Sequence, residues 1–151
     1  MIDRFERFSI AISEISRYWH KIAADELEKY SLKGPHSIYL TALYQFEDGV
    51  TAARLAELCG RDKSDVSRMM TIMEQRGLVT RCGTNNYRAQ LQLTEKGREA
   101  AEHIRSRAAT AVALAGKDLS DEARAVFYEA LGSIAENLRV LSRDGLPSEE
   151  G

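Results

Sequence analysis

Basic and hydroxyl side chains of the kind that contact nucleic acids gather in one short segment: Arg61, Lys63, Ser64, Ser67 and Arg68. Lysine and arginine neutralise phosphates, serine bonds phosphate oxygens or base edges, and arginine can bond one guanine through two N–H groups. The apolar residues of the segment have helical spacing and are expected to point back to a core: Val66, Met69, Met70 and Met73. The pattern therefore predicts a helix that binds a duplex rather than one that carries out catalysis.

A second polar set follows where the pattern changes from helical spacing to alternation. Residues 78–81 predict a strand, 83–86 a turn, and 87–93 a second strand with alternate apolar side chains facing inward. This β-hairpin would carry four more candidates for contact with nucleic acid: Arg81, Asn85, Asn86 and Arg88.

Two short helices joined by a tight turn come before the hairpin. Thr51 is a good N-cap for the first helix, and Gly60 suits the left-handed position after its end. Asp62 can cap the second helix, and Asp65 resembles its partner in a capping box. Two such helices followed by a hairpin form a winged helix-turn-helix, whose second helix enters the major groove of DNA.

The charge along the chain favours this interpretation. The 151 residues carry a net charge of −2, which alone argues against a nucleic-acid partner. Residues 61–88, however, hold six basic and three acidic side chains, a net charge of +3, and the rest of the chain carries −5. We expect a recognition helix at about 62–76 in the major groove and a wing at 78–93 at the backbone or minor groove.

Longer helices are predicted on either side of this region. Apolar residues three or four apart run through 2–31, a short helix is expected at 36–47, Thr94 begins an alanine-rich helix, and a last helix follows Ser120. The fold class is mainly α with a small β-hairpin wing. The apolar stripe of the first helix fits both a core-facing helix and a seam between two copies of the chain. The candidates for a dimer seam are Phe5, Phe8, Ile12, Ile15, Phe127, Leu131, Ile134 and Leu138.

Three short segments resemble one known family. The run RDKSDVSRMM at 61–70 and the run EQRGLV at 74–79 look like the recognition-helix signature of the multiple antibiotic resistance regulator (MarR) family. The run LQLTEKG at 91–97 looks like that family's exit from the wing into the next helix. Helix order and length also match over about residues 2–143.

The resemblance implies a single MarR-like domain over residues 1–151 that forms a homodimer and binds a palindromic operator. Family members are mostly repressors, and many release DNA when a small phenolic or lipophilic ligand binds. The implied parts are dimerisation helices at 2–34 and 117–143, a winged DNA-binding lobe at 36–93, a connecting helix at 94–116 and a tail at 144–151.

By position, the resemblance makes Ser64, Ser67 and Arg68 contacts to base edges or phosphates, and Arg81 and Arg88 contacts of the wing. The family wing commonly has an Asp before its arginine. Here the corresponding run is Asn85-Asn86-Tyr87-Arg88, so the residue that usually orients the arginine is missing.

A pocket for an aromatic or phenolic effector is expected near the junction of the first two helices. Trp19, His20, His36 and Tyr39 flank this junction, and aromatic walls with a few polar groups suit such a ligand. The alternative is that Trp19 and Tyr39 belong to the core.

Other function classes have weaker support. Cys59 is expected to be a buried thiol, and exposed Cys82, beside Arg81, is the candidate for a redox role. The three histidines show no metal-ligand spacing, no catalytic or cofactor constellation is visible, and no apolar run suits a membrane span or secretory signal, so we expect a cytoplasmic protein without metal or cofactor. The rival from another class is a dimeric helical module whose winged lobe binds a protein, and a sensor enzyme is more remote.

Overall fold

The computed structural model describes residues 2–83 and 89–149. They fall into two compact units, Met1–Ala109 and Thr110–Gly151. Asn85, Asn86 and Arg88 of the predicted wing lie outside the described residues.

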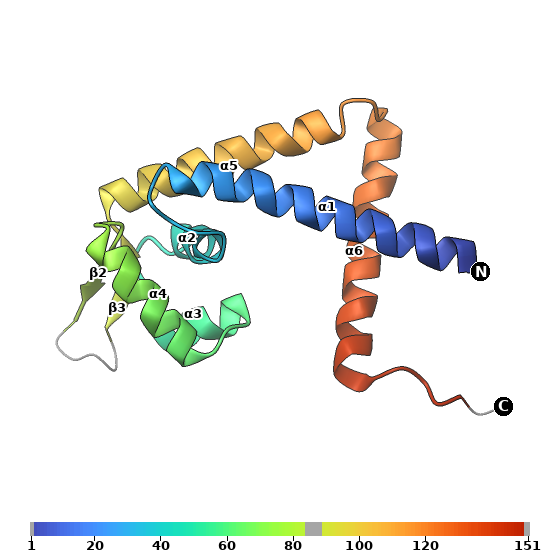
Figure 1. The fold of residues 1–151 in the computed structure, drawn as a ribbon. Coiled ribbons are helices and arrows are strands. Elements are labelled where there is room, and N and C mark those ends of the chain that lie inside the picture. Colours follow the sequence, from blue (N-terminus) through green and yellow to red (C-terminus); the bar gives the residue numbers. More distant parts are fainter. Residues whose placement is uncertain (1, 84–88, 150–151) are drawn as a thin grey trace. The chain divides into compact units, whose positions relative to one another are not determined.

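The first unit holds five helices and a small sheet (Figure 1). The helices are α1 (Ile2–Glu28), α2 (His36–Tyr44), α3 (Ala52–Cys59), α4 (Lys63–Gln75) and the greater part of α5 (Glu95–Ala115). The strands are β1 (Val50–Thr51), β2 (Val79–Cys82) and β3 (Gln90–Leu93). The sequence predicts each helix, although α1 and α2 end a few residues before the predicted limits of 31 and 47.

The sheet has a strand that the sequence pattern does not predict. Its order is β1-β3-β2, all antiparallel, so the hairpin of β2 and β3 is extended by the two residues of β1. Gly49 enters β1 with a positive φ of 92°, and a Cβ there would lie 2.8 Å from Cβ of Gln90. A glycine is therefore required where the chain passes this close to β3.

The turn between α3 and α4 is built as the sequence predicts. The Thr51 hydroxyl accepts from the backbone N–H of Arg54 at 3.2 Å, and Gly60 ends α3 in the left-handed conformation. The Asp62 carboxylate caps α4 by accepting from the N–H of Asp65 at 2.7 Å. These caps satisfy backbone groups that helix ends leave unpaired, and so they fix the start of α4.

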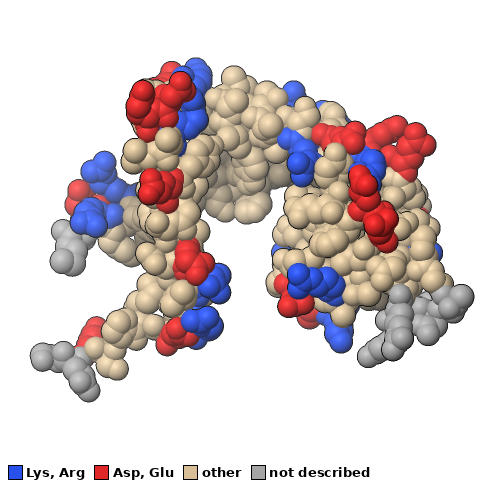
Figure 2. Space-filling view, turned by 180° about the vertical axis from the view of Figure 1, so that it is seen from behind, with Lys and Arg blue, Asp and Glu red and all other residues tan. Residues whose placement is uncertain are grey.

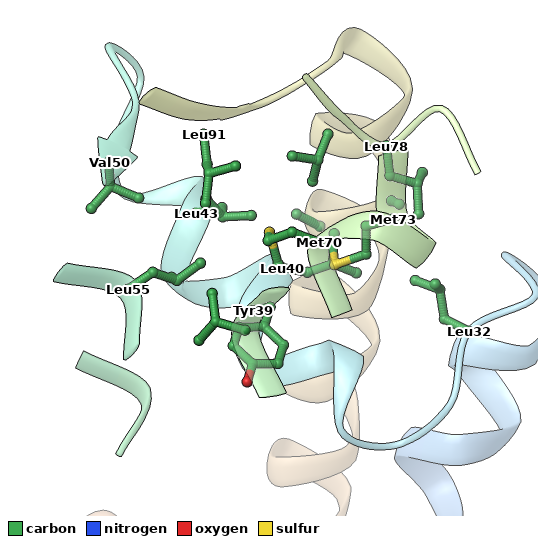
Figure 3. Close-up of a cluster of buried hydrophobic side chains, with 14 of the residues drawn as sticks. Leu32, Tyr39, Leu40, Leu43, Val50, Leu55, Met70, Met73, Leu78 and Leu91 are labelled. Carbon is green, nitrogen blue, oxygen red and sulfur yellow. The ribbon is translucent and has the colours of Figure 1, made fainter. Parts of the chain in front are cut away.

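One apolar core holds α2, α3, α4 and the sheet together (Figure 3). It includes Leu40 and Leu43 from α2, Met70 and Met73 from α4, and Leu91 from β3, all fully buried. Burying a side chain of this size contributes roughly 1.5–3 kcal/mol. Because α4 gives its apolar face to this core, its opposite face is held at the surface.

The second unit consists of the end of α5, a turn and α6 (Asp121–Asp144). Ser120 caps α6 by accepting from the N–H of Ala123 at 3.1 Å. Among the described residues, α6 buries no side chain, and Leu138 is 49% exposed. On α1 of the first unit, Phe5 is 69% exposed. Apolar stripes this open are typical of faces that pack against another apolar surface.

Among the residues that the structure describes, no helix is both long enough and apolar enough to span a membrane.

Candidate nucleic-acid interface

The outward face of α4 carries the basic and hydroxyl side chains predicted from the sequence. Lys63, Ser64, Ser67 and Arg68 are exposed, with Arg61 exposed just before the helix. The buried residues of α4 are Val66, Met70 and Met73, which face the core. The structure therefore brings all five predicted α4 candidates to one exposed region at the surface.

Arg68 stands on this face with one internal partner. Its Nη2 lies 3.4 Å from Oδ1 of Asp65, and its side chain remains 71% exposed. The other carboxylate oxygen of Asp65 accepts a hydrogen bond from the Tyr39 hydroxyl. The capping box predicted from the sequence is therefore only half formed. The N–H of Asp65 donates to the Asp62 carboxylate, but the Asp65 side chain contacts Tyr39 and Arg68.

Arg81, which was predicted to contact DNA from the wing, has a partner within the protein. Its Nε donates to Oε1 of Glu74, so the guanidinium on β2 is paired with the side of α4. A hollow between these elements is lined by Ser67, Glu74, Arg81 and Leu91 among others. The pair fixes the base of the wing against α4.

The end of α4 is held against the start of α5 by three residues that were not predicted as site residues from the sequence: Thr94, Lys96 and Gly97. The Thr94 hydroxyl donates to the carbonyl oxygen of Gly77 at 2.6 Å and accepts from the N–H of Gly97 at 3.0 Å. The Lys96 ammonium donates to the carbonyl oxygen of Arg76 at 3.0 Å, at the helix end where a positive charge is favoured. Gly97 itself is buried against Leu78. The sequence feature that could have pointed to these residues is the run LQLTEKG at 91–97, which resembles the exit of the family's wing into the next helix.

A cavity of about 460 Å³ lies within the first unit between α1, α2, α3 and α5. Its walls are mainly apolar and include Trp19, Ile38, Phe46 and Leu58, with Gln45 among the polar groups. A cavity of this size and lining suits a small aromatic molecule.

The four residues predicted to bind a ligand separate in the structure. Trp19 lines the cavity, whereas His20 is exposed and lies 3.3 Å from the hydroxyl of Ser16. Tyr39 and His36 are buried, and the cavity lining comes from other residues of α2. Burial lowers the pKa of His36, whose Nδ1 accepts from the N–H of Lys33 at 2.7 Å. Tyr39 and His36 therefore lie on the core side of α2.

The two cysteines lie in different surroundings. Cys59 is half-buried in the cavity wall, where burial raises the pKa of its thiol. This fits the expected inert thiol, because the thiolate is the reactive form. Cys82 is exposed on β2, with its sulfur 3.4 Å from Oε1 of Gln92.

A cluster of polar side chains on one side of the cavity joins α1 to α5. The Glu26 carboxylate lies 2.7 Å from Nζ of Lys29, 2.8 Å from Nε2 of His103 and 3.1 Å from Nε of Arg107. Hydrogen bonds from Lys29 and then His103 lower the pKa of Glu26 to about 2. Figure 1 shows α1 running alongside α5 over this part of the unit.

This cluster predicts a pH dependence of stability. Because the Glu26 pKa is lower in the folded chain than its usual 4.5, ionised Glu26 stabilises the fold above about pH 4.5. That contribution is lost as the pH falls toward 2. We expect the free energy of unfolding, measured with urea between pH 5 and 2, to fall less in Glu26→Gln than in the wild type. Glu47→Gln, in an exposed turn, should follow the wild type; identical profiles for all three proteins would contradict the prediction.

Charge is unevenly spread over the first unit. In Figure 2, most of the acidic side chains of this unit, on the right of the picture, gather at its upper edge, whereas basic and acidic side chains lie side by side at its lower edge. Two short capped helices, an outward polar face on the second and a sheet beside it together define a winged helix-turn-helix protein.

Comparison with known proteins agrees with this class. The model of the MarR family matches residues 30–86, which cover α2, the helix-turn-helix and the start of the wing. No curated protein matches the chain.

Solved structures match over most of the chain. A MarR transcriptional regulator from Methanosarcina mazei Go1 is 25% identical, with a TM-score of 0.75, over 89% of this chain and 92% of that one. A MarR family protein from Listeria monocytogenes, complexed with a 26-mer DNA, is 22% identical, with a TM-score of 0.73, over 92% and 95%. CouR from Rhodococcus jostii RHA1, bound to p-coumaroyl-CoA, is 22% identical, with a TM-score of 0.69, over 85% and 91%.

The resemblance to the MarR family of transcriptional regulators is supported by the family model over residues 30–86 and by the fold of these solved structures. The fold expected from its recognition-helix and wing-exit segments, mainly helical with a small antiparallel wing, is confirmed.

Proposed function

We propose that the protein is a homodimeric repressor, without enzymatic activity, that binds a palindromic operator. Helix α4 enters the major groove, and the wing lies at the backbone or minor groove. The observation that carries the proposal is the exposed face of α4. Its exposed side chains are all polar: Lys63, Ser64, Ser67, Arg68, Thr71 and Gln75. A protein partner would favour apolar side chains on this face, and so DNA is the better fit.

A titration with DNA tests this function. We expect the protein to shift a labelled duplex from upstream of its own gene at low and moderate salt, with an affinity that falls steeply as salt rises. Binding that is equal for this duplex and for a scrambled one of the same composition would count against an operator there.

The exposed stripes of α1 and α6 support dimerisation. Two copies that bury these stripes against one another would remove from water the side chains of Phe5, Ile15, Leu131 and Leu138 among others. The two α4 helices would then lie about one helical turn of DNA apart, ~34 Å.

Sedimentation velocity checks the dimer. We expect Leu138→Asp, which places a charge in the α6 stripe, to sediment as a monomer at concentrations where the wild type is a dimer, because an unpaired charge is costly to bury. Ala125→Asp adds the same charge to the opposite face of α6 and should stay dimeric. A monomeric wild type, or a dimeric Leu138→Asp, would refute this seam.

We further propose that the cavity of the first unit binds a small aromatic or phenolic effector that releases DNA. Its apolar lining and its Gln45 and Arg107 side chains support this, as does the p-coumaroyl-CoA bound by CouR. Trp19 is the only tryptophan of the chain and lines the cavity, so its fluorescence reports on occupancy.

We expect p-coumarate to change Trp19 emission saturably in the wild type. Thr41→Phe, which fills part of the cavity, should weaken this response at least tenfold, whereas Ala24→Phe, outside the lining, should leave it unchanged. An equal response in all three proteins would place ligand binding elsewhere.

A further inference from the structure

Asp65 is an acidic residue in the first turn of a helix whose exposed side chains are otherwise basic or uncharged and polar. A carboxylate directed toward DNA would repel phosphates. The Asp65 side chain instead turns back toward the protein and is only 19% exposed. One of its oxygens accepts from Tyr39, and the other faces Arg68. The carboxylate therefore lies between Tyr39, which is buried in the core, and Arg68, which is exposed.

Tyr39 is one of the fully buried side chains of the core. It is 1% exposed and packs in the core between Leu40 and Leu55, and its hydroxyl leaves the apolar cluster at its edge (Figure 3). Burial raises the pKa of this phenol above its usual range, and the bond to Asp65 raises it further. Tyr39 therefore stays protonated and donates to Asp65 over the working pH range.

We infer that Asp65, anchored by Tyr39, is a positioning residue that orients Arg68 for contact with a base. This inference rests on the proposed function. The core holds Tyr39, the Tyr39 hydroxyl holds the Asp65 carboxylate, and this carboxylate in turn orients the Arg68 guanidinium. Arginine carries five N–H groups, so the one directed at Asp65 leaves others for DNA.

The physical gain is preorganisation. A free arginine loses side-chain entropy when it is fixed. A carboxylate that restricts the guanidinium before DNA binds lowers this cost and limits the directions in which the fork can point. The negative charge of Asp65 also disfavours docked arrangements in which a DNA phosphate would lie close to this carboxylate. Both effects favour the cognate sequence over non-specific duplex.

The test uses the full-length protein and two DNA probes. The first is the duplex that the wild type selects from a randomised library, and the second is a scrambled duplex of equal composition. We expect Tyr39→Phe to lose about tenfold affinity for the selected duplex, because Arg68 would be less well preorganised for its base contact. Its affinity for the scrambled duplex and its salt dependence should stay at wild-type values.

Tyr44→Phe is the matched control. Tyr44 lies on the same helix, and its hydroxyl also donates to a carboxylate, Oε1 of Glu102 on α5, at 3.3 Å. It should retain wild-type affinity for both duplexes. Asp65→Asn, which keeps its shape but loses its charge, should bind the scrambled duplex more tightly and the selected one more weakly.

A double-mutant cycle separates positioning from simple structural support. At low salt, where Arg68→Ala still binds measurably, the effect of Tyr39→Phe should disappear when Arg68 is already alanine. An equal loss in both backgrounds would overturn the inference, as would an unchanged affinity ratio in Tyr39→Phe. If the wild type selects no sequence at all, the proposed function fails, and the inference fails with it.

Discussion

Replacing Arg68 with alanine is expected to abolish sequence-specific DNA binding and leave the fold and the dimer intact. Arg68 is exposed on the outward face of α4, and apart from the contact with Asp65 its guanidinium is directed to solvent. A lost base contact costs ~1–3 kcal/mol per site, and a dimer loses it twice. The affinity for the selected duplex should therefore fall roughly 30-fold to 10⁴-fold.

Fluorescence anisotropy with labelled duplex measures this loss. Arg139→Ala is the matched control, because Arg139 lies on α6 and pairs with Glu136 of the same helix. It should bind like the wild type. Both variants should keep wild-type circular dichroism and sedimentation. If Arg68→Ala retained wild-type affinity and specificity, α4 would not be the element that reads DNA.

Gly97→Ala is expected to destabilise the joint between the wing and α5 severely. A Cβ at this position would lie 1.9 Å from the carbonyl oxygen of Leu78, which is backbone and cannot rotate away. The same oxygen accepts from the N–H of Thr94 at 3.0 Å, so separating the two segments also breaks this bond. We expect a loss of about 3 kcal/mol or more in the free energy of unfolding, at or above the upper end for overpacked sites.

Urea denaturation measures the change, with Gly34→Ala as the control. A Cβ at Gly34 meets no atom within 4 Å, and Gly34 lies outside the positive-φ region. The control should therefore differ from the wild type by less than about 1 kcal/mol. Equal changes for the two variants would mean that the close approach at Leu78 relaxes at little cost.

Local sequence signals were enough for the helix-turn-helix. Thr51, Gly60 and Asp62 act through backbone groups within a few residues, and each cap forms as predicted. The polar and apolar faces of α4 also follow from spacing alone, because a helix surface repeats about every 3.6 residues. The family-like runs extended this local prediction to the whole fold.

Contacts between distant residues could not be predicted in the same way. Strand β1 has only two residues and exists because it pairs with β3 about forty residues later. Asp65 looks like a capping residue locally, but its carboxylate bonds Tyr39, which lies 26 residues earlier. Arg81 is likewise paired with Glu74 across the base of the wing. In each case the local pattern was compatible with several partners, and tertiary packing selected one.

The ligand residues illustrate the same limit. Trp19, His36 and Tyr39 flank the predicted junction of the first two helices. In the structure, however, Tyr39 and His36 lie on the core side of α2, and a different face of this helix, with Ile38 and Thr41, lines the cavity. The polar cluster of Glu26, His103 and Arg107 joins helices far apart in sequence. The sequence therefore indicated the region of the cavity, but of the four predicted ligand residues only Trp19 lines it.

Selection of duplexes from a randomised library by the wild-type protein tests the central claim most directly. We predict enrichment of a two-fold symmetric sequence whose half-site centres lie about one helical turn apart, ~34 Å, with binding that weakens steeply as salt rises. Enrichment of no sequence, or of a site without two-fold symmetry, would contradict a dimer that reads DNA through two copies of α4.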